Sequence, residues 1–231
     1  MSRIKWDESG KRFYETGVDQ AVLYPIDDDG KYSLGVPWNG ITAVTESPSG
    51  AEATPLYADN IKYATLRGAE NFGITIEAYT YPDEWAQCDG SETPVTGVRL
   101  GQQGRKTFGF VYRSKIGNDQ STDLGYLYHI IYGLTASPSE RSYTTINDSP
   151  DAITFSWECS SVPAAVTGTN YKAVSCITVD TTKFTDTAGK AALAALETLL
   201  FGGTGESATA QLPNPVTVLT TLGWTAPTTV G

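Results

Sequence analysis

The strongest constraint on the fold is a series of strand-like segments that recurs through most of the chain. Residues 153–160 (ITFSWECS) alternate apolar and polar side chains, and residues 72–79 place their apolar side chains on one face at period two. Residues 106–113 and 125–134 are rich in aromatic residues and nearly continuous in apolar ones, as in strands covered on both faces. Shorter runs lie at 21–24, 41–45 and 173–179. The sequence therefore predicts seven to ten strands and a mainly β fold.

Two segments have helical signals instead. Residues 82–88 (PDEWAQC) begin with proline and two acidic residues, which favour the first turn of a helix, and Asp89-Gly90 follows as a stop signal. A second helix is predicted at about 187–201, with Thr187 as its cap, a stripe of leucines and a stop at Gly202-Gly203. Strands with one amphipathic helix indicate a sandwich or partly closed barrel whose open side or edge the helix covers.

The domain organisation that we expect is one β domain with extensions. The length of 231 residues fits a single large all-β unit, and the sequence has no internal repeat and no linker before residue 180. We expect an N-terminal arm at 1–12, the β domain at 13–205, and a Pro- and Thr-rich extended arm at 206–231. Residues 47–60 lack a strand or helix pattern and are too many for an ordinary hairpin loop. Long loops in compact domains are usually functional.

Composition excludes several classes of protein. The 26 acidic residues against 16 Lys and Arg give a net charge of −10, whereas a tight grip on phosphate backbones needs clustered Lys and Arg. The sequence has no stretch near the ~18 apolar residues that span a bilayer, and residues 1–10 lack the apolar region of a secretory signal. Three cysteines without a CxxC pair indicate neither a zinc site nor a disulfide framework. We expect reduced thiols in a cytoplasmic setting.

Candidate catalytic residues are few. His129 is the only histidine, and its place in an apolar strand favours a hydrogen-bonded structural role. A Ser-His-Asp triad has little support without a GxSxG motif. A pair of His129 with Cys159 or Cys176 is conceivable, although buried strand cysteines are usually inert.

Carboxylates offer an alternative, since a glycosidase needs only two of them ~5–9 Å apart. Those that lie close in sequence to Tyr79, Tyr81 and Trp85 are Glu77, Asp83, Glu84 and Asp89. This resembles a sugar-binding cleft, but the simpler interpretation is that the acids start a short helix and the aromatic residues form part of the core. Likewise, residues 27–30 (DDDG) indicate a turn rather than a calcium loop, and residues 101–106 (GQQGRK) lack the G-K-[ST] of a P-loop. We predict no catalytic, metal-binding or cofactor-binding residue.

Longer strings of the sequence resemble one protein family. They are 38–44 (WNGITAV), 46–52 (ESPSGAE), 56–63 (LYADNIKY), 75–85 (TIEAYTYPDEW), 88–90 (CDG), 101–103 (GQQ), 105–109 (RKTFG), 117–119 (GND) and 147–150 (NDSP). In this order, from about residue 13 to 222, the chain is similar to the major tail (tail tube) proteins of long-tailed, non-contractile bacteriophages of Gram-positive hosts. The last residues, 224–231, fall outside the similarity.

The resemblance implies two packed antiparallel β-sheets flanked by one α-helix, similar to type VI secretion tube proteins. It implies a structural virion protein, not an enzyme, that needs no cofactor and forms hexameric rings whose inner wall is a continuous β-barrel. Rings would stack around a tape-measure protein and meet tail terminator and baseplate or distal tail proteins. Double-stranded DNA would pass through the lumen without sequence-specific contacts. The expected location is the virion tail, assembled in the host cytoplasm, with no membrane insertion of this chain.

The resemblance also assigns the contact between rings to the long loop. The residues expected there are Ser47, Pro48, Ser49, Gly50, Ala51, Glu52, Leu56, Tyr57, Asp59 and Asn60. The acidic excess suggests that some carboxylates line the lumen and keep DNA from sticking. Two other interpretations stay open: a soluble carbohydrate-binding β-sandwich, and a hydrolase that uses Glu77 with Asp83 or Glu84.

Overall fold

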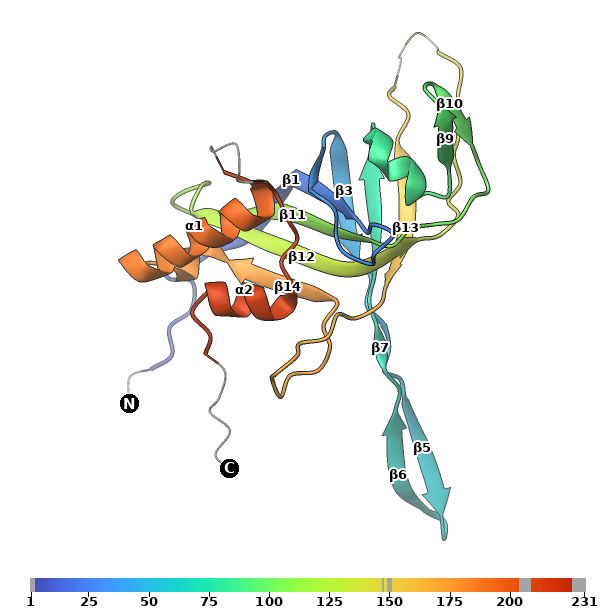
Figure 1. Ribbon diagram of the computed structural model, residues 1–231. Helices are drawn as coiled ribbons and strands as arrows, with labels where there is room; N and C mark the ends of the chain where they lie inside the picture. Colours follow the sequence, from blue (N-terminus) through green and yellow to red (C-terminus); the bar gives the residue numbers. More distant parts are fainter. Residues whose placement is uncertain (1–2, 147, 149–150, 204–208, 226–231) are drawn as a thin grey trace.

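An antiparallel sheet of eight strands dominates the computed structural model (Figure 1), which describes residues 3–146, 148, 151–203 and 209–225. The strand order is β2-β1-β11-β12-β13-β8-β3, and β14 also pairs with β12. The bounds are β1 Tyr14–Pro25, β2 Val36–Trp38, β3 Ile41–Glu46, β8 Gly73–Ala78, β11 Phe108–Gly117, β12 Gly125–Ala136, β13 Phe155–Ser161 and β14 Cys176–Asp180. The predicted mainly β, sandwich-like fold is confirmed.

Strand β12 divides this sheet into two layers, because its two halves have different partners. Residues 127–131 pair with β14, whereas residues 134–136 pair with β13. Between them, Gly133 has a φ of +62° beside a register shift against β11, and a Cβ there would overlap the carbonyl oxygen of Val162. Only glycine fits this bulge. The strand bends here, so β14, β12, β11, β1 and β2 form the first layer, and β13, β8 and β3 form the second.

Alternate side chains of the strands point to opposite faces of the sheet and contribute to two separate hydrophobic cores. Between the layers, Trp38, Trp85 and Trp157 contact one another with ring centroids 4.6 to 5.5 Å apart. On the other face of the first layer, Tyr24 and Tyr132 lie beneath two helices, α1 (Thr187–Phe201) and α2 (Pro215–Thr221). Burial of each such side chain contributes about 1.5–3 kcal/mol to stability, so the first layer is covered on both faces.

The helices differ from the prediction in number and in detail. Helix α1 matches the predicted 187–201, but Asp186 rather than Thr187 is its cap, since the Asp186 side chain accepts the Gly189 N–H at 3.3 Å. Residues 82–88 form a shorter 3-10 helix, η1 (Asp83–Gln87), whose Trp85 is anchored in the core. A further 3-10 turn, η2 (Thr181–Lys183), follows β14.

The C-terminal region is not simply an extended arm, because helix α2 lies within it. The side chain of Asn214 accepts the Thr217 N–H at 2.8 Å, Pro215 occupies the first turn, and Val218 is fully buried. These are standard reasons for a helix to begin. Residues 206–208 and 226–231 of the expected arm lie outside the described residues. In the N-terminal segment, the backbone N–H of Gly10 donates to Asp119 at 3.0 Å.

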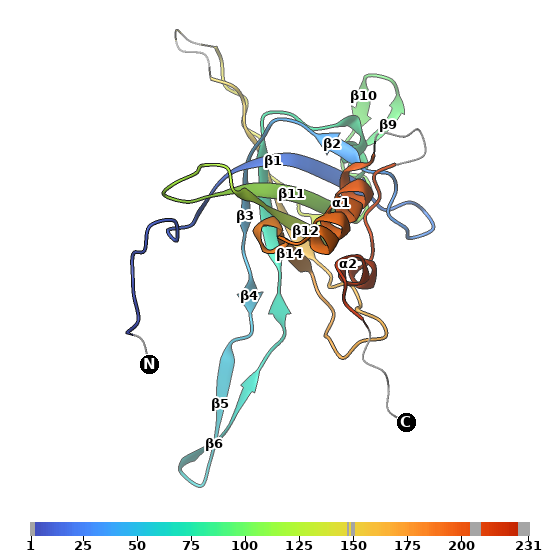
Figure 2. The same cartoon turned by 90° about the vertical axis from the view of Figure 1, so that its left-hand side faces the viewer.

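The expected loop at 47–60 is instead one half of a long β-hairpin, and that part of the prediction is wrong. We call residues 47–72 the arm; its strands are β4 (Ser49–Gly50), β5 (Ala53–Ala58), β6 (Ile61–Arg67) and β7 (Glu70–Asn71). Asp59 and Asn60 have φ values of 50° and 64°, which is the backbone of a tight hairpin turn. The arm extends away from the sheet in both views (Figures 1 and 2).

Candidate assembly surfaces

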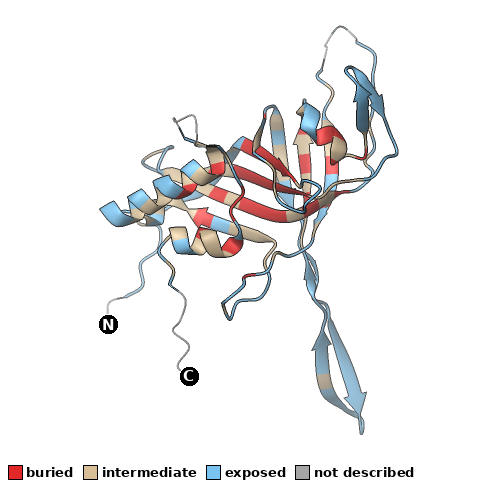
Figure 3. Cartoon of the chain, in the orientation of Figure 1, coloured by how far each residue is buried: buried red, intermediate tan, exposed pale blue. Residues whose placement is uncertain are grey.

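The arm exposes apolar side chains that the rest of the described chain does not cover (Figure 3). In β5 and β6 every residue except Ala64 is exposed, including Tyr57 (71%), Ile61 (64%) and Tyr63 (74%). A group of exposed apolar residues in one segment marks an interaction site. All ten residues expected in the long loop lie in this hairpin, in β4, β5, their connections and the turn; their part in ring stacking stays a prediction.

The pairing register gives the arm two chemically different faces. Partners across a hairpin share a face, and Thr54 pairs with Leu66, Leu56 with Ala64, and Ala58 with Ile61. Residues 54, 56 and 58 alternate along β5, and a register shift between Leu56 and Tyr57 leaves Tyr63 as an extra residue of β6, so these pairs form one uncharged surface. We call it the aliphatic face: Leu56, Ala58, Ile61, Ala64 and Leu66. The opposite face carries Tyr57, Lys62, Thr65 and Arg67.

A second exposed apolar surface lies at the opposite end of the molecule in both views (Figures 1 and 2). Strands β9 (Glu92–Val95) and β10 (Val98–Leu100) form a short hairpin there, in which Val95 pairs with Val98 and Glu92 with Leu100. The three apolar side chains are exposed. Arg99 alternates with them and turns toward η1, where it reaches Asp83 at 2.8 Å. We call the face formed by Val95, Val98 and Leu100 the β9–β10 surface.

Besides the outer edge of the short strand β2, two longer strand edges of the first layer have no β partner within the described residues. Strand β1 pairs with β11 along its length but with β2 only at residues 21–23, so the outer edge of residues 14–19 is unpaired. On the other side, β14 pairs with β12 alone. These two edges bound the same unit of four antiparallel strands. Unpaired edges present backbone N–H and C=O groups that can pair with another chain.

A polar network joins the root of the arm to the first layer. Glu46, the last residue of β3, accepts a hydrogen bond from the Tyr112 hydroxyl at 2.8 Å, and its Oε1 lies 3.2 Å from His129 Nδ1. The His129 ring stacks on Tyr112 with centroids 4.4 Å apart. The hydrogen bond with His129 lowers the pKa of Glu46, and burial raises the pKa of Tyr112. The predicted hydrogen-bonded role of His129 is confirmed.

The contacts of His129 have the order of a serine–histidine–carboxylate triad, since its Nε2 lies 3.3 Å from Ser114 Oγ. Ser114, however, is in the middle of β11 and only 8% exposed, and its hydroxyl also donates to Glu15 at 3.2 Å. The backbone around Ser114 pairs with β1 on one side and β12 on the other. Its N–H groups are therefore committed to the sheet and cannot form an oxyanion hole. The arrangement fits a structural chain of hydrogen bonds.

The three cysteines lie within the described residues and are free thiols. Burial raises the pKa of Cys88 and Cys159 to about 12 and that of Cys176 to about 11. At neutral pH all three are protonated and poor nucleophiles. Cys176 Sγ lies 3.9 Å from Thr178 Oγ1, and among the described hydrogen bonds none joins a cysteine to His129. The conceivable Cys–His pair does not form.

The carboxylates considered for a sugar cleft do not converge. Glu77 alternates with the buried Ile76 and Ala78, so it lies on the face of β8 that points away from the inter-layer core. Segment η1 packs on the other side, where its Trp85 enters that core. Asp83 is already paired with Arg99. Glu77 and segment η1 therefore lie on opposite sides of β8.

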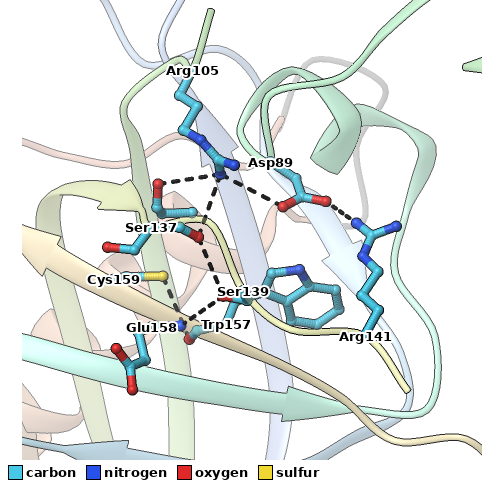
Figure 4. Close-up of polar contacts among 9 residues, drawn as sticks. Asp89, Arg105, Ser137, Ser139, Arg141, Trp157, Glu158 and Cys159 are labelled. Carbon is cyan, nitrogen blue, oxygen red and sulfur yellow. Dashed lines mark hydrogen bonds and ion pairs between the residues drawn. The ribbon is translucent and has the colours of Figure 1, made fainter. Parts of the chain in front are cut away.

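Asp89 has a structural partner set that sequence reasoning did not find (Figure 4). Its side chain is 8% exposed and lies between Arg105, at 3.6 Å, and Arg141. Arg105 also donates to the carbonyl oxygens of Ala136 and Ser137 at 3.3 and 3.4 Å. The cluster ties the end of η1 to the segment after β12. Its members come from distant parts of the chain, so no local pattern announces it.

The remaining motifs have structural roles. Asp27 Oδ1 accepts the N–H groups of Asp29 and Lys31 at 3.0 and 2.8 Å, which confirms the predicted turn. Lys106, from the glycine-rich run, pairs with Asp28 at 2.7 Å. Across the described residues, no cluster of three His, Cys, Asp or Glu side chains could hold a metal ion. A helix long and apolar enough to cross a membrane is also absent from the described part of the chain.

Comparisons with known proteins add little. No family model and no curated protein matches the chain. Among solved structures, a similar chain is the sheath/tube terminator of an extracellular contractile injection system, PVC, in the extended state. It is 14% identical, the alignment covers 77% of this chain and 100% of that chain, and the TM-score is 0.29. At that TM-score the likeness carries no argument about fold or function.

Proposed function

We propose that this protein is a structural component of a phage-type tail, which assembles with copies of itself into stacked hexameric rings that form a hollow tube. The observation that supports this most is the pair of unpaired edges, residues 14–19 of β1 and strand β14, on opposite sides of one antiparallel unit. If each edge pairs with the opposite edge of the next copy, the sheet continues from subunit to subunit. Such a heterologous contact closes into a ring when its rotation closes.

The partners and the task of the tube follow from the sequence resemblance. The lumen would hold a tape-measure protein during assembly and let genomic double-stranded DNA pass during ejection. Tail terminator and baseplate or distal tail proteins would bind the two ends, and the protein would reside in the virion. The net charge of −10 suits this role, since like charge close to the duplex prevents sticking.

The test is electron microscopy of the purified chain together with a variant of one edge. Thr178→Lys places a charged side chain at an exposed position of β14, which discourages edge-to-edge pairing. Ala191→Lys, at an exposed position of α1, is the matched control. We expect six-fold rings or tubes from the parent and the control, and isolated folded subunits from Thr178→Lys. A parent chain that stays monomeric at high concentration, or rings from Thr178→Lys, would contradict the proposal.

A further inference from the structure

We propose that the arm of one copy docks its aliphatic face on the β9–β10 surface of the next copy, in a head-to-tail contact along the direction of the arm. The inference rests on the proposed self-assembly and adds the receptor for the arm. Each chain carries one arm and one β9–β10 surface, at opposite ends of the molecule (Figures 1 and 2). A copy displaced along the arm therefore presents its β9–β10 end to the arm of the copy before it.

The reach of the arm suits this contact. At ~3.3 Å per residue, the strand path from Ser47 to Asp59 extends roughly 40 Å from the sheet. An arm of this length would place the β5–β6 hairpin well beyond the sheet of its own subunit. The paired backbone of β5 and β6 keeps the aliphatic face in a fixed orientation, so less conformational freedom is lost on docking than for a disordered loop.

The two surfaces match in chemistry. The aliphatic face of the arm has no charged member, and Leu56, Ile61 and Leu66 are exposed. On the receptor, Val95 and Val98 face the same way because they pair across the β9–β10 hairpin. Both surfaces are faces of two-stranded hairpins, which can pack together as two layers of side chains. Contact would remove both apolar faces from water, the main source of free energy in protein association.

Charge favours the same orientation. Lys62 and Arg67 outnumber Asp59 in the β5–β6 hairpin, although the whole chain has a net charge of −10. At the other end, Glu92 pairs with Leu100 and so lies on the same face as the β9–β10 surface, and Glu84 lies nearby in η1. The β5–β6 hairpin at the tip of the arm therefore has a small positive charge, and its attraction to an acidic end would add specificity and speed of encounter more than affinity.

Disulfide trapping tests the contact directly in assembled protein. Cys176 is first replaced by serine, because it is the one cysteine of the three that is not fully buried. Ile61→Cys is then combined with Val98→Cys. The matched control combines Thr65→Cys, on the opposite face of the arm, with the same Val98→Cys. Under mild oxidation we expect a ladder of linked oligomers from the first pair and a loss of that ladder in the control.

Assembly of point variants separates this inference from the proposed function. We expect Ile61→Asp and Val98→Asp to form rings that no longer stack, and Thr65→Asp to form tubes like the parent. All three positions are exposed, so each variant should fold. Tubes of normal length from Ile61→Asp or Val98→Asp, or equal trapping by both cysteine pairs, would overturn the docking. Absence of rings from the parent chain would instead overturn the proposed function.

Discussion

The inter-layer core and the arm both contain large aromatic side chains, but the core buries them and the arm exposes them. In the core, Trp38, Trp85 and Trp157 are almost completely buried, whereas Tyr57 and Tyr63 of the arm are largely exposed. Each core aromatic residue stabilises the single chain, and each arm residue can contribute a comparable ~1.5–3 kcal/mol only when another surface covers it. Folding and assembly therefore depend on separate regions of the chain. Substitutions should therefore change one without the other.

The largest loss of stability is expected for Trp157→Ala. Its side chain is in contact with both other core tryptophans, and truncation leaves a cavity that the two layers cannot close. We expect unfolding in urea to show a loss of about 3–5 kcal/mol. Tyr63→Ala in the arm is the matched change and should stay within about 0.5 kcal/mol. A loss below 1 kcal/mol for Trp157→Ala would contradict the role of the inter-layer core as the main source of stability.

Asp89→Asn should have the next largest effect. The change leaves Arg105 and Arg141 facing a neutral group inside a partly closed cluster. Loss of hydrogen bonds to charged partners costs about 2 kcal/mol, to be measured by the shift of the urea midpoint. The control is Asp83→Asn, because Asp83 pairs with Arg99 in the open and such surface pairs contribute less than about 1 kcal/mol. Equal effects of the two variants would contradict this assignment.

Glu46→Gln tests the junction between the core and the arm. The pKa of Glu46 is lower in the folded chain, mainly because of its hydrogen bond with His129. Its carboxylate therefore stabilises the fold above the ordinary glutamate pKa of ~4.3 and loses this effect as the pH falls through the folded value. We expect the variant to lose about 1 kcal/mol at pH 7 and progressively less as the pH falls below the ordinary glutamate pKa of ~4.3. The measurement is thermal unfolding of the parent and the variant at a series of pH values. Curves of stability against pH that run parallel would contradict this role of the Glu46 carboxylate.

Removal of the arm should have the smallest effect on stability. Gly50 and Glu70 pair across the root of the hairpin, so a two-residue Asn-Gly turn can replace residues 51–69. We expect the free energy of unfolding to change by no more than about 0.5 kcal/mol, because the deleted residues lie outside both cores. Stacking, seen by microscopy, should be lost. A variant that unfolds at much lower temperature would show that the arm stabilises the subunit after all.

The elements that could be predicted from the sequence are those in which burial of one face produces a periodic pattern of apolar residues. The alternation of β13 and the leucine stripe of α1 fall where the structure has them, because each element presents a single face to a core. The arm lacks such a trace, since no core lies against either of its faces. Its turn also lacks glycine and uses Asp59 and Asn60 instead.

Other features depend on contacts that only the folded chain makes. Helix α2 was missed because five of its seven residues are the β-branched Thr and Val, which have low helix propensity, although Asn214 and Pro215 are a cap and first-turn pair that could have indicated it. The Asp89 cluster joins three segments that no local pattern connects. The assignment of residues 47–60 to assembly came from family resemblance, and the structure adds that this segment is exposed and paired with residues 61–71.

The bend of β12 at Gly133 has a mechanical consequence. Residues 127–131 and 134–136 belong to one continuous strand but pair with strands of different layers. Separation of either layer would therefore strain the hydrogen bonds of the other. The subunit should therefore unfold in a single cooperative transition, with amide hydrogens in both halves of β12 exchanging at the same slow rate. A force applied at one face of the subunit would be transmitted through this strand to the other.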